Sequence, residues 1–201
     1  FWGDTHLHTN LSMDAGAFGN RLGLDDAYRF SRGEEVISSS GQQARLARPL
    51  DWVVLADHSD GMGVFTALME QDPRFMKYED GAKWSGMIRE GRGVEAAMDL
   101  IGKFSQGTLQ WSSKDPAMMR PVWQQVIDAA ERHNTPGQFT ALIGYEWTSL
   151  IKGNNLHRVV IYRDNGDKVT QTLPYTNDDS SNPEDLWSAL QAYETKTGGS
   201  V

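Results

Sequence analysis

The stretch Leu50–Ala56, with the sequence LDWVVLA, is an apolar run of strand length that stops abruptly at DHSDGMG. A strand that is buried on both faces needs such a run, whereas a strand with one face in water alternates apolar and polar residues. Strands of the buried kind belong to parallel sheets, whose connections are long and usually helical. The run therefore predicts an α/β fold and places the carboxyl end of a parallel strand at Asp57.

The rest of the chain supplies elements that fit such a fold. We expect a strand over residues 2–8, an irregular loop (TNLSMDAGAFGNRLG), a helix over 25–32 closed by Gly33, and a small hairpin within EEVISSSGQQARLA. From about residue 64 to 134 the apolar residues fall at helical spacing, which predicts a large helical insertion, with its best helix in MMRPVWQQVIDAAERHN.

Two further strands, QFTALIGYEWTSL and NLHRVVIYRD, follow the insertion. The connection around Lys152 and Gly153 is shorter than the dozen or more residues that a parallel crossover needs, so the two strands should form an antiparallel hairpin. Asn182 and Pro183 predict the start of a last helix that continues through Tyr193.

Composition limits the classes of function. The chain has 201 residues, 39% of them hydrophobic, which suits one domain with a substantial core. Its net charge of -8 and pI near 5.1, without a basic cluster, argue against a nucleic-acid partner. No apolar run approaches the roughly 20 residues of a membrane span. Since there is no cysteine, any metal must bind to His, Asp and Glu.

The sequence FWGDTHLHTN places two histidines on one face of the first strand. Side chains two residues apart in a strand point the same way, so the rings of His6 and His8 lie side by side. The motif alone is explained equally well by two solvated histidines on a surface strand or by a divalent metal bound to both rings.

Other polar residues stand where strands end or begin, and the carboxyl ends of parallel strands converge on one rim, where α/β enzymes build active sites. Each has a plain structural explanation: His58 can cap a turn, Glu146 can form a buried ion pair, and His157 can be an exposed strand residue. Their shared position, together with His6 and His8, favours a metal-binding cluster of the kind that suits Zn, Mn or Fe rather than Ca or Mg. Only His133 lies on an ordinary helix surface.

The combined series GDTHLHT, LSMDAG, LADHSD, GYEWT and NLHRVVIY resembles the first motifs of the polymerase and histidinol phosphatase (PHP) superfamily. The stretches SMDAGAFGNRLG and RPLDWVVLADHSDGMG also resemble a bacterial PHP-like family known as domain of unknown function 3604. The resemblance covers most of the chain except the helical insertion.

The resemblance implies the N-terminal part of a distorted PHP-type β/α barrel with a helical insertion, and a site with two or three divalent metals. By motif, His6 and His8 bind one metal, Glu146 bridges two, and the neighbouring sites are completed by Asp14, His58 and His157. Glu146 and His58 are then the central catalytic groups. Asp57 is expected to support a metal-bound imidazole by accepting its other N–H.

The chain departs from the family pattern in one respect: a PHP barrel has a histidine on its fifth strand and a closing Asp-x-His, but this sequence has no histidine after His157. We therefore expect the chain to be the N-terminal part of a longer bacterial enzyme. By itself it should be inactive, bind metal incompletely and be prone to self-association through an unpaired strand edge.

The favoured function is a metal-dependent hydrolase, a phosphoesterase by resemblance, acting on a small anionic substrate. Arg158 and Arg21 are the candidates for a phosphate clamp, although an arginine on a strand or loop is more often a solvated surface residue. Two alternatives stay open: a PHP-like module that has lost catalysis and serves in binding or structure, and a metal-dependent hydrolase of amides or other esters.

Overall fold

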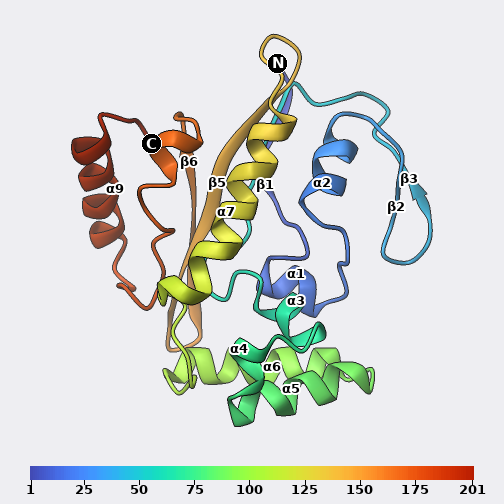
Figure 1. Ribbon diagram of the computed structural model, residues 1–201, viewed down its shortest axis with the longest axis vertical. Coiled ribbons are helices and arrows are strands. Elements are labelled where there is room, and N and C mark those ends of the chain that lie inside the picture. The colour runs from blue at the N-terminus through green and yellow to red at the C-terminus, as the bar shows by residue number, and fades with distance from the viewer.

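The computed structural model describes residues 1–201, and its centre is a four-stranded sheet in the order β1–β4–β5–β6. The strands are β1 (Gly3–Leu7), β4 (Trp52–Leu55), β5 (Thr140–Ile151) and β6 (Asn154–Tyr162). As the sequence predicts, β1, β4 and β5 are parallel, and β6 pairs antiparallel with β5. The fold is therefore mixed α/β, and the sheet curls into a half-barrel (Figure 1).

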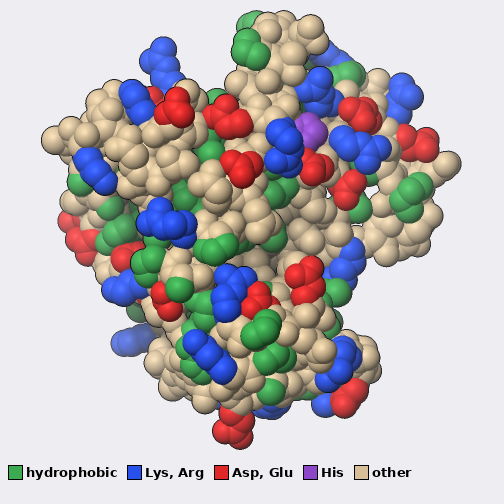
Figure 2. Space-filling view, in the orientation of Figure 1, with side chains coloured by type: hydrophobic (Ala, Val, Ile, Leu, Met, Phe, Trp, Pro, Cys, Tyr) green, Lys and Arg blue, Asp and Glu red, His purple; other side chains and the backbone are tan.

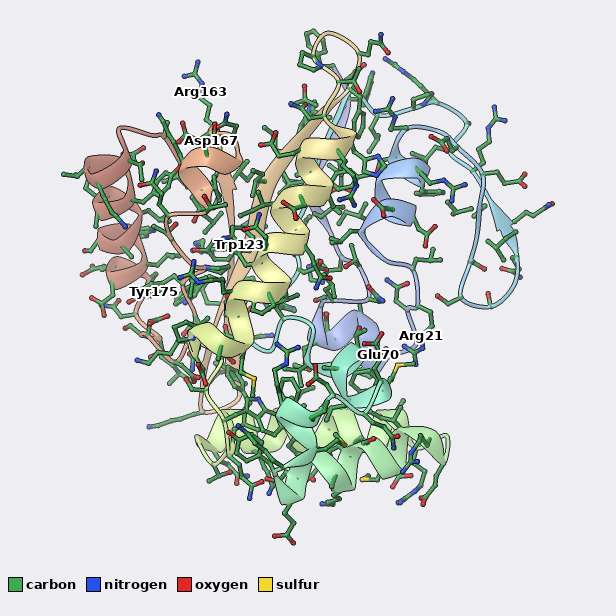
Figure 3. The ribbon with its side chains drawn as sticks, in the orientation of Figure 1. Arg21, Glu70, Trp123, Arg163, Asp167 and Tyr175 are labelled. Atoms are coloured by element: carbon green, nitrogen blue, oxygen red, sulfur yellow. The ribbon has the colours of Figure 1, made fainter.

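One face of the sheet is covered by helices α2 (Leu24–Ser31) and α7 (Pro116–His133) (Figure 1). The main core lies between them and the sheet, because alternate strand residues such as Val53, Leu55 and Tyr145 point to this face. Trp123 of α7, labelled in Figure 3, packs edge-on against Tyr145 with ring centroids 5.9 Å apart. The opposite, concave face carries the polar residues described below.

Helices α8 (Gly166–Val169) and α9 (Pro183–Thr197) follow the hairpin and lie beyond β6 (Figure 1). Helix α9 begins as predicted, with the Asn182 side chain accepting the Glu184 N–H and proline at the first helical position. It ends at Thr197, four residues later than expected, and is followed by Gly198 in the left-handed conformation. None of the helices combines the length and apolar character needed to cross a bilayer.

The predicted insertion is helical, but it divides into two parts. Helices α3 (Val64–Met69), α4 (Pro73–Met76), α5 (Glu79–Arg89) and α6 (Gly93–Gln106) form a lobe with its own small core around Trp84 and Leu68. Helix α7 belongs to the main core instead.

Positive and negative side chains are interspersed over the face of the molecule shown in Figure 2.

The first loop departs from the prediction, because it contains a helical turn, α1 (Met13–Ala17), where the sequence indicated only irregular structure. Gly16 is required there by close packing rather than by flexibility, since a Cβ at this position would lie 2.8 Å from the Asn10 carbonyl oxygen. The expected small hairpin is present as β2 (Val36–Ile37) and β3 (Gln43–Ala44).

Candidate metal centre

The parallel register of β4 and β5 places His58 beside Glu146. Val54 pairs with Leu142, and a bridge four residues further along each chain joins His58 to Glu146 in the same register. The backbone continues this pairing, because Glu146 N–H donates to the Asp57 carbonyl and Ser59 N–H donates to the Glu146 carbonyl. The two side chains therefore lie next to each other just beyond the end of β4, whereas Glu146 itself lies midway along β5 and not at its end, where the sequence predicts it.

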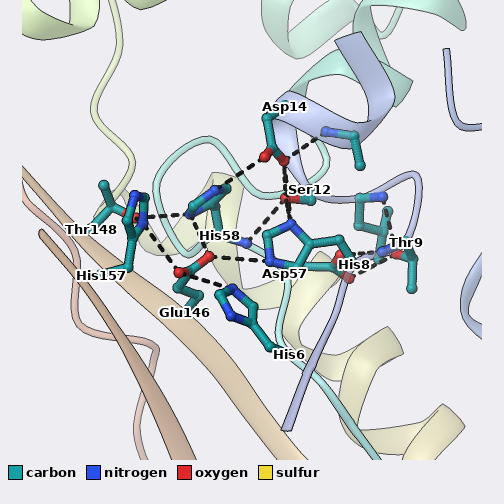
Figure 4. Close-up of polar contacts among 12 residues, drawn as sticks. His6, His8, Thr9, Ser12, Asp14, Asp57, His58, Glu146, Thr148 and His157 are labelled. Atoms are coloured by element: carbon teal, nitrogen blue, oxygen red, sulfur yellow. Dashed lines mark hydrogen bonds and ion pairs between the residues drawn. The ribbon is translucent and has the colours of Figure 1, made fainter. Parts of the chain in front are cut away.

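The antiparallel hairpin brings in His157 from β6. Thr148 of β5 lies opposite His157, and Glu146 is two residues before Thr148, so all three side chains share the concave face. From the other side, β1 and its following residues contribute His6 and His8. Residues from β1, from the end of β4 and from the β5–β6 hairpin thus meet on the concave face of the sheet (Figure 4).

Glu146 is the centre of the cluster, and its side chain is only 1% exposed. Oxygen Oε1 lies 3.0 Å from His6 Nε2 and 3.1 Å from His157 Nδ1. Oxygen Oε2 lies 3.1 Å from both His8 Nε2 and His58 Nδ1. One carboxylate therefore has an imidazole nitrogen from each of four histidines against it (Figure 4).

A second carboxylate, Asp14, lies on the other side of two of these rings. Its Oδ1 is 3.3 Å from His8 Nδ1, and its Oδ2 is 3.4 Å from His58 Nε2. The Ser12 hydroxyl donates to Oδ1 at 2.6 Å. Asp14 also accepts the Ala15 N–H, so the helical turn α1 holds the carboxylate in place.

The donor atoms fit divalent metal ions. His8 Nε2 and both Glu146 carboxylate oxygens are buried and have no hydrogen-bond partner, although imidazole nitrogens and carboxylate oxygens face each other at close range. Buried polar atoms normally have partners, and a cation would provide one for every lone pair here. Three overlapping groups have ligand atoms within 4.8 Å of one another: His6–His8–Glu146, His8–Asp14–His58 and His58–Glu146–His157.

The electrostatics of the protein alone reflect this crowding of acids and bases. Burial disfavours a charged His8, but the close contacts with the Asp14 and Glu146 carboxylates outweigh burial and raise the pKa of His8 to about 10. Burial likewise opposes ionisation of Asp14 and Glu146, yet contacts with the histidines hold the pKa of both carboxyls below the usual range. Burial lowers the pKa of His157. Both acids are thus ionised at neutral pH.

The structure brings together all six residues expected to bind metal, but it corrects the role of Asp57. This buried carboxylate accepts the Thr9 backbone N–H at 2.6 Å and the Thr9 hydroxyl at 2.7 Å, and no imidazole N–H. Asp57 therefore positions the cluster through the backbone that follows His8. Because its side chain alternates with that of His58 along the chain, it points away from the imidazoles.

Neither arginine expected to clamp a phosphate faces the side chains of the cluster, although Arg158 donates to the backbone carbonyl of His157 at 2.7 Å. Arg158 pairs across the hairpin with Trp147, whose side chain is in the main core, so it emerges on the opposite face of β6 from His157. Arg21 donates to the Gly16 and Asn20 carbonyls. Figure 3 shows Arg21 beside Glu70, where the first loop meets the helical lobe.

Two hydroxyl residues of the cluster are absent from the sequence-based prediction. Thr148 Oγ1 lies 2.8 Å from His58 Nδ1 and 3.0 Å from His157 Nδ1, and Ser12 Oγ lies 2.9 Å from His8 Nδ1. Thr148 could have been predicted, because it is two residues after Glu146 on the same strand and therefore points to the same face. No comparable pattern marks Ser12, which lies in a loop.

Comparisons with known proteins add one finding. A family model described as "Protein of unknown function (DUF3604)" matches residues 1–201. No curated protein and no solved structure matches the chain.

Proposed function

The chain belongs to the family of proteins of unknown function DUF3604, and this family does not indicate an activity. From the geometry of the site, we propose that the protein is a metal-dependent hydrolase of the PHP superfamily that acts as a phosphoesterase. The observation that carries the proposal is the buried Glu146 carboxylate with four imidazole nitrogens against it at 3.0–3.1 Å. A carboxylate that only forms a structural ion pair needs one cationic partner. Glu146 has four histidines around it, which is more than a structural ion pair requires.

The three groups of donor atoms correspond to two or three ions of Zn, Mn or Fe, held by His6, His8, Asp14, His58, Glu146 and His157. When bound, such ions supply Lewis acidity, lower the pKa of a water molecule and orient an anionic substrate. Glu146 belongs to two of the groups, so it could help to hold the ions of both. His58 also belongs to two groups, so these residues are the proposed centre of the catalytic machinery.

The arrangement of the site supports the proposed barrel. The parallel strands β1, β4 and β5 have helices on the outer face, and the polar cluster lies at the carboxyl ends of β1 and β4, beside the middle of the longer strand β5. Active sites of β/α barrel enzymes likewise lie at the carboxyl ends of parallel strands. We propose that the half-barrel sheet is the N-terminal part of a PHP-type barrel, and that the helical lobe is an insertion into it.

One observation favours a second candidate, a metal-dependent hydrolase of amides or non-phosphate esters. Arg158 faces away from the cluster and Arg21 contacts the carbonyls of its own loop, so neither supplies the bidentate recognition by which arginine selects phosphate. Both candidates share the same donor atoms. A module without catalysis is disfavoured because buried ligands without hydrogen-bond partners are kept at a cost in stability.

The test measures metal content and turnover of the full-length protein. Protein treated with a chelator is reloaded separately with Zn²⁺ or Mn²⁺, and its metal content is measured. It is then assayed against phosphate monoesters, phosphodiesters, carboxylate esters and amides. Metal-dependent cleavage of a phosphoester supports the first proposal, and cleavage of only amides or carboxylate esters supports the second. A protein that binds neither metal contradicts both.

A further inference from the structure

Ser12 is a fully buried residue that links three parts of the cluster. Its hydroxyl donates to Asp14 Oδ1 at 2.6 Å and lies 2.9 Å from His8 Nδ1, and it accepts the backbone N–H of His58 at 3.4 Å. We propose that Ser12 is a positioning residue that selects which nitrogen of His8 faces the metal, an inference that rests on the proposed metal-dependent function.

Counting hydrogens around the hydroxyl gives the direction of each bond. A serine hydroxyl has one hydrogen, and an ionised carboxylate can only accept, so the hydrogen of Ser12 is directed to Asp14. The Ser12 oxygen then presents a lone pair to His8 Nδ1. Asp14 Oδ1, 3.3 Å from the same nitrogen, is a second acceptor. A nitrogen that faces two acceptors carries the hydrogen.

This arrangement decides the state of the other ring nitrogen. A metal-bound imidazole is neutral and carries hydrogen on only one nitrogen, so a hydrogen at Nδ1 leaves the lone pair of Nε2 for the metal. His8 Nε2 is buried without a hydrogen-bond partner and points to Glu146, 3.1 Å from Oε2. Ser12 therefore favours the form of His8 that presents its lone pair to the candidate metal site.

The simplest alternative is that Ser12 is an ordinary helix cap. Ser12 is at the N-cap position of α1, where a serine hydroxyl usually accepts a backbone N–H from the first turn. Here the hydroxyl accepts no N–H of α1. The side chain is directed instead to His8 and Asp14, so the hydroxyl serves the cluster rather than the helix.

A second alternative is that Asp14 alone orients His8. Its contact with His8 Nδ1 is longer, at 3.3 Å against 2.9 Å for Ser12. The other Asp14 oxygen faces His58. Asp14 is also a candidate ligand itself, whereas a neutral hydroxyl can remain an acceptor for Nδ1. The two explanations differ in what removal of the Ser12 hydroxyl does.

The experiment compares Ser12→Ala, which removes the hydroxyl, with Ser12→Thr, which retains it, in the full-length protein. Ser31→Ala is the matched control: Ser31 is also buried, and its hydroxyl donates to the Ala27 carbonyl of α2, away from the cluster. Zn²⁺ affinity is measured by competition with a chromophoric chelator. Long-range ¹H–¹⁵N spectra of Zn²⁺-loaded, ¹⁵N-histidine-labelled protein show which nitrogen of His8 carries hydrogen, with His8→Asn used for assignment.

Loss of a group that orients a metal-bound histidine weakens metal binding about 10- to 100-fold. We expect that loss in Ser12→Ala, with altered His8 ¹⁵N signals, and recovery of most of the affinity in Ser12→Thr. Ser31→Ala should match the wild type. Unchanged Zn²⁺ affinity and His8 signals in Ser12→Ala would overturn the inference, as would equal losses in Ser12→Ala and Ser31→Ala.

The Zn²⁺ affinities, together with the hydrolysis assays described for the proposed function, separate this inference from that function. If wild-type protein binds Zn²⁺ but hydrolyses no substrate, the hydrolase proposal fails while the affinity comparison still decides the role of Ser12. If wild-type protein binds neither Zn²⁺ nor Mn²⁺, both are overturned.

Discussion

Replacement of Glu146 by glutamine removes a buried charge with little change in volume. The carboxylate contacts four imidazole nitrogens and belongs to two of the three groups of candidate ligands. In Glu146→Gln, one carboxylate oxygen becomes an NH₂ group, which can donate but cannot bind a cation. One side of the cluster therefore loses its anionic ligand, and the amide oxygen on the other side carries no formal charge.

The expected loss follows from the number of contacts affected. A hydrogen bond to a charged group contributes about 1.5–3 kcal/mol, and a metal contact of the same carboxylate should contribute at least as much. Two such contacts give about 3–6 kcal/mol, which corresponds to a factor of about 10² to 10⁴. Metal affinity and kcat/KM should fall by at least this much.

The assay measures Zn²⁺ or Mn²⁺ affinity and hydrolysis by wild-type protein, Glu146→Gln and His133→Ala, with far-UV circular dichroism as the check on folding. His133 lies at the end of α7, where it stacks on Tyr28 and contacts Asp25, so His133→Ala should retain metal and activity. Retention of both by Glu146→Gln, or equal losses in the two variants, would refute the placement of the site at Glu146.

Three further predictions concern residues around the cluster and in the lobe. Arg158→Ala and Arg21→Ala should leave KM for an anionic substrate unchanged in steady-state assays, because Arg158 donates only to the backbone carbonyl of His157 and Arg21 to carbonyls of its own loop; a large rise in KM would place that arginine at the substrate. Asp57→Ala leaves two buried donors of Thr9 without an acceptor, so urea denaturation should show a loss of about 2–4 kcal/mol; unchanged stability would contradict this role. Hydrogen bonds from Lys83 and Trp84 lower the pKa of Asp99, so its stabilising effect is present above the unfolded pKa and is lost as pH falls through the folded pKa. Asp99→Asn should therefore be less stable than wild type at pH 7 in urea titrations, with a difference that disappears in strong acid; a difference independent of pH would refute the linkage.

The sequence predicted the elements whose local pattern is strong. The apolar run ending at Asp57 identified a parallel strand, and the short connection at Lys152 and Gly153 identified the hairpin. These two features bring His58 and His157 to Glu146. The helical turn α1 was missed because Gly16 suggests a loop, whereas the structure needs glycine there for close packing against Asn10.

Errors at the site arose where a side chain's direction or its tertiary partner decides its role. Arg158 follows His157 directly, so strand alternation sends it to the other face, and the period of two could have excluded it as a clamp. Asp57 was expected at an imidazole, but its partner Thr9 comes from the neighbouring strand end. The role of Ser12 depends on contacts with His8 and His58 that exist only in the folded chain.

The shared register of β4 and β5 also has a consequence for folding. A shift of one residue in the pairing of β5 would turn Glu146 to the helical face and present Tyr145 or Trp147 to the histidines. Such a misaligned chain could keep most of its strand hydrogen bonds but could not assemble the carboxylate with the imidazoles. A metal ion that binds only the correctly aligned sheet would stabilise it by mass action. Metal binding would therefore favour the correct strand pairing over the shifted one.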